Sequence, residues 1–114
     1  MNKSRIGLFS YEDGFKEGLA KEAAEFLRGR GYDAECVEDI TKLESFDVVL
    51  IHPGVNNQKR ATDFYLRHPK VRTAILTPEP EDYVRENDIP IISYRIESLL
   101  KFLEEPDGRS KAFK

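Results

Sequence analysis

The sequence FDVVLI, at residues 46–51, constrains the fold more than any other stretch of the chain. Its centre is apolar at every position, whereas a strand with one face in water alternates apolar and polar residues. Continuously apolar strands are typical of parallel sheets that carry helices on both faces. The stretch therefore predicts a central strand of an α/β protein.

Segments of strand length alternate with segments of helical period on either side of this run, over residues 5–104. Further strands are expected at RIGLFS, YDAECVE, VRTAILT and IPIISYR, which begin at residues 5, 32, 71 and 89. Strands that alternate with helices predict a parallel sheet with right-handed crossovers. We expect a three-layer sandwich whose five strands have the order 2-1-3-4-5, because YDAECVE is half polar and suits an edge.

Helices are expected between the strands, at residues 15–30, 56–68 and 96–105, with a short helix within residues 78–88. Asp13 stands where an N-cap belongs, and Gly31 stands where a left-handed residue would end the first helix. Only seven residues, DITKLES at 39–45, join the second strand to the third. Because a helical crossover needs more residues, we expect a single turn of helix at most, or a loop.

Each expected helix carries apolar residues at spacings of three and four, which predicts one side facing the sheet. Residues 1–105 are expected to form a single domain, followed by a tail at 106–114 that lacks periodicity. The inward sets are Phe15, Leu19, Ala23, Phe26 and Leu27 in the first helix, Ala61, Phe64, Tyr65 and a candidate stem of Arg67 in the next, and Ile96, Leu99, Leu100 and Leu103 in the last.

Composition limits the classes of partner and location. The 18 Lys and Arg and the 21 Asp and Glu residues give a net charge of −3, with both signs interspersed, so nucleic acid is not an expected partner. The single cysteine, Cys36, has no disulfide partner in the chain, which favours a reducing compartment, and we expect the cytoplasm. No apolar run approaches the roughly 20 residues of a membrane span, and no membrane association is expected.

The stretch FDVVLIHPG resembles the DLVLLD…PG segment of response-regulator receiver domains, and the similarity of pattern covers residues 5–104. The resemblance implies a flavodoxin-like fold. In that family, the residue aligned with His52 is the aspartate that accepts a phosphoryl group. Two acidic residues hold a magnesium ion where Ser10 and Tyr11 stand here, while Glu12 and Asp13 lie displaced downstream.

Of the other family positions, the hydroxyl residue that ends the fourth strand is matched by Thr77. The lysine expected after the fifth strand has no clean equivalent among Ser93, Tyr94 and Arg95. One of four functional positions is therefore retained. This pattern resembles the pseudo-receivers, which keep the fold and signal through protein contacts without aspartyl phosphorylation.

The opening RIGLFSYEDGF also resembles the start of flavodoxins, which hold the phosphate of FMN in a Ser/Thr-rich loop after the first strand. That loop here is SYEDG, and the carboxylates of Glu12 and Asp13 would repel a phosphate dianion, so no flavin is expected. The same opening is similar to TIR domains, whose enzymatic members cleave NAD with a glutamate on the helix after the third strand. The corresponding helix, at residues 57–68, has Asp63 as its only acid, so this activity is not expected, while a TIR-like interaction role stays open.

A functional surface is expected at the carboxyl ends of the strands, where the winding of a 2-1-3-4-5 sheet reverses. No residue is assigned a catalytic role, and neither a metal nor a cofactor is expected. The candidate residues are Ser10, Tyr11, Glu12, Asp13, His52, Thr77 and Arg95.

Two interpretations of this surface stay open. His52 is either a general base, metal ligand or phosphoryl acceptor, or a structural imidazole satisfied by backbone groups at a strand end. Glu12 and Asp13 either bind a divalent cation or cap the first helix. The leading hypothesis is a non-catalytic signalling or interaction module whose partner is another protein. The alternative is a small enzyme or nucleotide-binding domain that uses His52 with Glu12 or Asp13, and a small-molecule ligand stays open.

Overall fold

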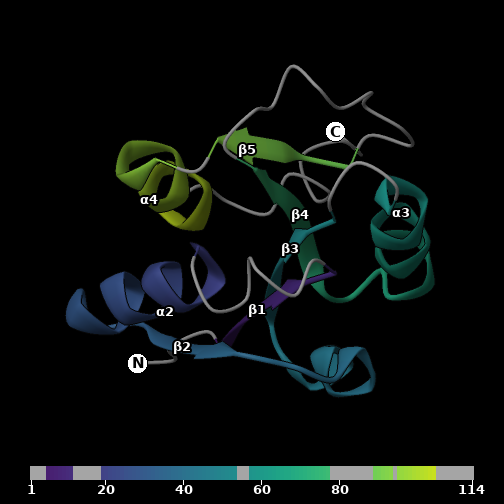
Figure 1. Ribbon diagram of the computed structural model, residues 1–114, viewed down its shortest axis with the longest axis horizontal. Coiled ribbons are helices and arrows are strands. Elements are labelled where there is room, and N and C mark those ends of the chain that lie inside the picture. Colours follow the sequence, from purple (N-terminus) through teal and green to yellow (C-terminus); the bar gives the residue numbers. More distant parts are fainter. Residues whose placement is uncertain (1–4, 12–18, 54–56, 78–88, 94, 105–114) are drawn as a thin grey trace.

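Five parallel strands form one sheet in the order β2-β1-β3-β4-β5 (Figure 1). The computed structural model describes residues 5–11, 19–53, 57–77, 89–93 and 95–104. This order confirms the predicted flavodoxin-like arrangement, with the half-polar strand at one edge and the apolar strand in the centre. The strands are β1 (Arg5–Ser10), β2 (Asp33–Cys36), β3 (Val48–His52), β4 (Arg72–Thr77) and β5 (Ile91–Ser93).

Helices cover both faces of this sheet (Figure 1). On one face lie α2 (Leu19–Gly29) and α4 (Ile96–Glu104), and on the other lie α3 (Gln58–Arg67) and η1, a 3-10 helix at Ile40–Ser45. The short connection between β2 and β3 holds only η1, so the prediction that no full helical crossover fits there is confirmed, although the six residues of η1 make about two turns of 3-10 helix where a single turn at most was expected. Among the described residues, no helix has the length and apolar character needed to cross a membrane.

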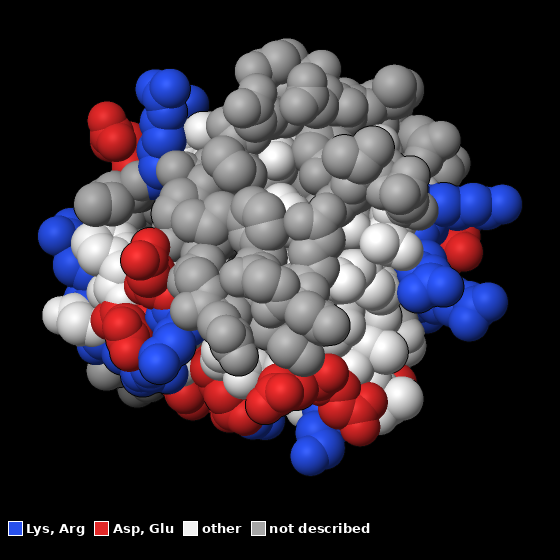
Figure 2. All heavy atoms as spheres, viewed as in Figure 1, with Lys and Arg blue, Asp and Glu red and all other residues white. Residues whose placement is uncertain are grey.

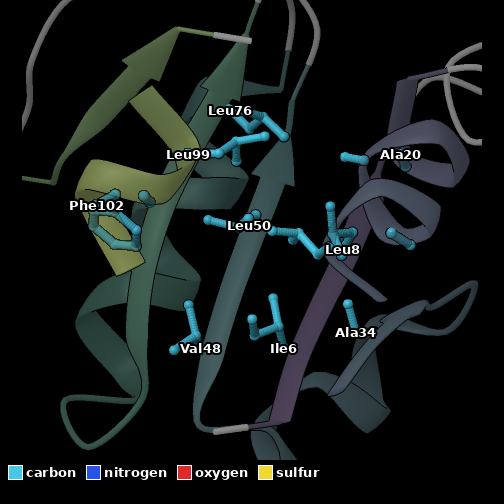
Figure 3. Close-up of a cluster of buried hydrophobic side chains, with 13 residues drawn as sticks. Ile6, Leu8, Ala20, Ala34, Val48, Leu50, Leu76, Leu99 and Phe102 are labelled. Atoms are coloured by element: carbon cyan, nitrogen blue, oxygen red, sulfur yellow. The ribbon is translucent and has the colours of Figure 1, made fainter. Parts of the chain in front are cut away.

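The core on the α2/α4 face is built from alternate residues of the three inner strands (Figure 3). Leu8 of β1 and Leu50 of β3 are register partners, and both side chains are fully buried. Figure 3 shows Leu99 and Phe102 of α4 reaching this layer from one side and Ala20 of α2 from the other. The core members are Ile6, Leu8, Val48, Leu50, Ala74 and Leu76 of the sheet, Ala20, Ala23, Ala24 and Leu27 of α2, Ala34 of β2, and Leu99 and Phe102 of α4.

Two helical stripes on this face differ from the sequence prediction. On α4, Phe102 is buried although the predicted stripe omitted it, while Leu100 is only half-buried. On α2, the ring of Phe26 is half-buried, and the buried side is formed by alanines with Leu27. Phe15 lies outside the described residues. Both differences correspond to a rotation of the helix about its own axis. Apolar spacing alone does not determine this rotation when a helix has more apolar residues than can face the sheet.

The core on the opposite face joins Phe9, Val49, Ile51 and Ile75 of the sheet to η1 and α3. The predicted inward residues of α3, Ala61, Phe64 and Tyr65, are buried, as is Thr62, whose hydroxyl donates to the carbonyl of Gln58 (3.2 Å). Arg67, whose stem was a candidate for an inward position, is exposed. A long cation gains more from water than from a position that the aromatic residues already fill.

The boundaries of α2 and η1 follow from capping chemistry. Gly31 has φ +92°, and its N–H donates to the carbonyl of Arg28 while the N–H of Tyr32 donates to that of Leu27 (both 3.0 Å). These two bonds form the left-handed C-cap that was predicted at Gly31. The carboxylate of Asp39 caps η1 by accepting from the N–H of Thr41 (3.0 Å). The predicted cap at Asp13, the short helix at 78–88 and the tail at 106–114 lie outside the described residues.

Candidate functional site

Ser10 and His52 end the two central strands, β1 and β3, at the predicted functional edge. They are register partners in the parallel sheet, and both are buried, with exposed fractions of 5% and 8%. Side chains alternate between faces along a strand, so Ser10 continues the series of Ile6 and Leu8 on the α2/α4 face, as His52 continues that of Leu50. The structure therefore brings this serine and histidine together, in an enclosed position.

The side chains of Thr77 and Tyr11 lie on the opposite face of the sheet, the one that α3 covers. Thr77 is two residues after Ile75, which belongs to the α3 core, and its register partner on β5 is Ser93. Tyr11 packs against the same core. The sheet thus divides the predicted surface into a Ser10–His52 pair on one face and a Thr77–Ser93 pair with Tyr11 on the other.

The backbone and ring of Tyr11 connect the end of β1 to β3 and α3. Its N–H donates to the carbonyl of His52 (3.0 Å), which extends the ladder one residue beyond β1. Its ring meets that of Phe9 edge-on, with centroids 4.9 Å apart and an interplanar angle of 89°. The guanidinium carbon of Arg60, on α3, lies 5.7 Å from the centroid of the Tyr11 ring, within the range of a cation–π contact.

Burial raises the pKa of the Tyr11 hydroxyl above its usual value, and two charges on α3 modify this shift. The positive charge of Arg60 lowers the pKa because it favours the phenolate, whereas the negative charge of Asp63 raises it. The net direction is upward, so the neutral phenol is favoured in the folded protein. Tyr11 therefore contributes to stability below the unfolded pKa of about 10, and this contribution is lost as the pH rises through the folded value.

We expect the titration of Tyr11 to report these two charges in opposite directions. Arg60→Gln should raise the folded pKa of Tyr11 further, and Asp63→Asn should lower it, because each substitution removes one of the two Coulombic effects. The measurement is an alkaline titration of ¹³C-labelled tyrosine by NMR, with Tyr11→Phe to assign the resonance. Shifts of the same sign in the two variants would contradict this placement of α3 beside Tyr11.

The remaining candidates are placed differently from these residues at the strand ends. Arg95 is exposed, and its backbone carbonyl accepts the N–H of Leu99 (3.0 Å), so it stands at the start of α4. Glu12 and Asp13 lie outside the described residues. Within the described part of the chain, no three His, Cys, Asp or Glu side chains come together in a way that could hold a metal ion.

Arg60 is the neighbour of Tyr11 that sequence reasoning did not identify. Its position in α3, three residues before Asp63, places both charges on the same side of the helix. The spacing was visible in the sequence, but the contact with Tyr11 depends on how α3 lies on the sheet.

Comparisons of this chain with protein-family models, with curated proteins and with solved structures found no match. Strand order and layering define the class of protein as an α/β protein with a flavodoxin-like arrangement.

Proposed function

We propose that this chain is a receiver-like module that acts by contacting another protein and accepts no phosphoryl group at the end of β3. The strand order is that of the receiver arrangement, and His52 occupies the last position of the third strand. Ser10, its register partner, is a hydroxyl residue where a receiver would carry an acid. A cytoplasmic location is part of the proposal and rests on the single cysteine, Cys36.

The burial of His52 is the observation that carries this proposal. Phosphoryl transfer requires the acceptor and the donor to approach in line, and charge on the transferred group must be neutralised. With 8% of its surface exposed and its Nδ1 atom buried, the imidazole offers little surface to a donor. A side chain held in this way suits a structural role at the strand end.

The alternative function, a small enzyme or nucleotide-binding domain, would require His52 to meet a substrate together with Glu12 or Asp13. General acid–base catalysis needs the imidazole within hydrogen-bond reach of the reacting group. The burial of both His52 and Ser10 weighs against such access. We therefore favour an interaction module over the enzyme.

Incubation with a small phosphoryl donor and Mg²⁺ should leave the intact mass of the protein unchanged. The measurement is mass spectrometry at neutral or alkaline pH, because phosphohistidine is lost in acid. A receiver domain that carries its aspartate serves as the positive control for the donor. Addition of a phosphoryl group to His52 would overturn the proposal and make the histidine a phosphoryl carrier.

The substitution His52→Asp should not by itself create an acceptor. An aspartyl acceptor works beside a magnesium ion, and the positions that would hold this ion are Ser10 and Tyr11. Rapid labelling of the single variant would contradict this expectation, because it would mean that Glu12 or Asp13 already supplies the metal ligands. The matched control is His52→Asn, because asparagine has nearly the same shape as aspartate but carries no carboxylate.

A further inference from the structure

The outer side of α3 is strongly basic. Lys59, Arg60 and Arg67 are exposed on the helix, and Lys70 is exposed just after it, while Asp63 is the one exposed acid of residues 59–70. This segment therefore carries a net charge of +3 in a chain whose net charge is −3. We call the exposed side of residues 59–70 the basic helix face. Leu66 lies within it, with 52% of its surface exposed.

The segment from β2 through η1 has the opposite charge. Residues 35–44 expose four acids, Glu35, Glu38, Asp39 and Glu44, and one base, Lys42, which gives a net charge of −3. We call this segment the acidic strip. Glu35 lies on the edge strand β2, whose outer backbone groups face away from the sheet. Charged side chains on such an edge discourage indiscriminate strand pairing but leave the edge open to a charged partner.

The two charged segments belong to the same side of the molecule, because α3 and η1 cover the same face of the sheet (Figure 1). Figure 2 shows acidic side chains gathered along the lower edge, where β2 and η1 lie in Figure 1, and basic side chains at the right, where α3 lies. Their net charges of +3 and −3 are equal and opposite. A surface of this kind is complementary to itself.

We propose that two copies of this chain associate about a two-fold axis, with the basic helix face of each copy on the acidic strip of the other. A two-fold interface uses the same surface on both copies, so each complementary contact is made twice. A rotation by two-fold symmetry exchanges the positions of two segments that lie side by side, which brings opposite charges together. Leu66 supplies apolar surface that such a contact would remove from water.

A second copy fits these charges better than a nucleic acid does. The acidic strip would repel a phosphate backbone that reached beyond α3, and the chain as a whole is negative. Exposed charge pairs contribute little affinity each and are screened by salt. The association is therefore expected to be weak and to depend strongly on ionic strength. It does not depend on the receiver-like function proposed above.

Sedimentation equilibrium tests this proposal on the unmodified chain. At about 50 mM salt the average mass should rise from that of one chain towards that of two, with a dissociation constant of roughly 10 µM to 1 mM, and should not exceed two chains. At about 500 mM salt the association should weaken at least tenfold. A wild-type chain that stays monomeric up to about 1 mM at low salt would overturn the proposal, as would growth beyond a dimer.

Charge-reversal variants identify the surfaces involved. The pair Lys59→Glu with Arg67→Glu should be monomeric, and so should the pair Glu35→Lys with Glu44→Lys, because each leaves like charges facing each other. An equimolar mixture of the two variants should recover the dimer, since each reversed segment then meets an opposite charge on its partner. Recovery in the mixture is a result that unfolding of either variant cannot produce.

The matched control reverses two lysines on the opposite face of the sheet. Lys21 of α2 and Lys101 of α4 are exposed, and Lys21→Glu with Lys101→Glu changes the net charge by the same amount as the α3 pair. At about 150 mM salt, where long-range repulsion is already largely screened, the dissociation constant of this control should stay within about threefold of the wild-type value. Equal loss of dimer in the control and in the α3 pair, or no recovery in the mixture, would contradict the proposed interface.

Discussion

Replacing Leu50 with alanine is expected to lower the free energy of unfolding by about 2–5 kcal/mol. Leu50 is fully buried in the middle of β3, the central strand of the sheet, between its register partners Leu8 and Ala74. In Figure 3 its side chain lies at the centre of the layer between the sheet and its two helices. The loss combines the transfer of apolar atoms with the cavity that rigid neighbouring strands leave open.

Chemical denaturation at equilibrium measures this loss, and Leu66→Ala is the matched control. Leu66 is 52% exposed on α3, so the same chemical change there should alter the free energy of unfolding by less than about 0.5 kcal/mol. The contrast between the two leucines tests the identity of the buried face independently of residue type. Equal effects at both positions would mean that β3 is not the centre of the core.

Local patterns in the sequence were sufficient to predict the strand order. The continuous apolar run VVLI at residues 48–51 required cover on both faces, and the half-polar residues of Asp33–Cys36 required an edge. The seven residues between them excluded a full helical crossover, and η1 is the single short helix that fits. These predictions succeeded because each depended on the length or polarity of one segment, which the chain itself determines.

Helix orientation was predicted less well, because it depends on the surface that a helix meets. The spacing in α4 allowed either Leu100 or Phe102 to face inward, and the structure buries Phe102. The guanidinium carbon of Arg72, on β4, lies 4.1 Å from the centroid of the Phe102 ring. A contact with an arginine on a distant strand cannot be read from the period of the helix.

The candidate site shows a similar limit. Ser10, His52 and Thr77 were correctly expected at the ends of their strands. Side chains point alternately to the two faces of a sheet. The face on which each of these side chains lies therefore depends on the exact register of its strand, and a shift of one residue moves the side chain to the other face. These residues were expected to form one surface, whereas the sheet separates Thr77 from the Ser10–His52 pair.

Gly7 explains how β1 accommodates the short connection between β2 and β3. A Cβ atom built at Gly7 would lie 3.0 Å from Cγ of Phe46 and 3.2 Å from Cδ2 of Leu43, closer than ordinary packing allows. Phe46 cannot easily move away, because its ring is buried among the core residues of this face, and the guanidinium carbon of Arg5 lies 4.5 Å from the ring centroid. The absence of a side chain at Gly7 therefore lets η1 and Phe46 pack directly on the strand.

The substitution Gly7→Ala should consequently lower the free energy of unfolding by about 1–3 kcal/mol, as expected for overpacking of a filled core. Gly29→Ala is the control with the opposite sign: apart from its chain neighbours and the backbone of its own helix, nothing lies within 4 Å of the position that a Cβ would take at the end of α2, so alanine there should stabilise by about 0.4–1 kcal/mol. Chemical denaturation measures both changes in the free energy of unfolding.

The double variant tests whether Phe46 is the residue that requires glycine at position 7. Combining Gly7→Ala with Phe46→Leu should lower the free energy of unfolding by less than the sum of the two single changes, because the smaller side chain makes room for the new methyl group. Additive costs would mean that Phe46 is not the residue that requires glycine at position 7.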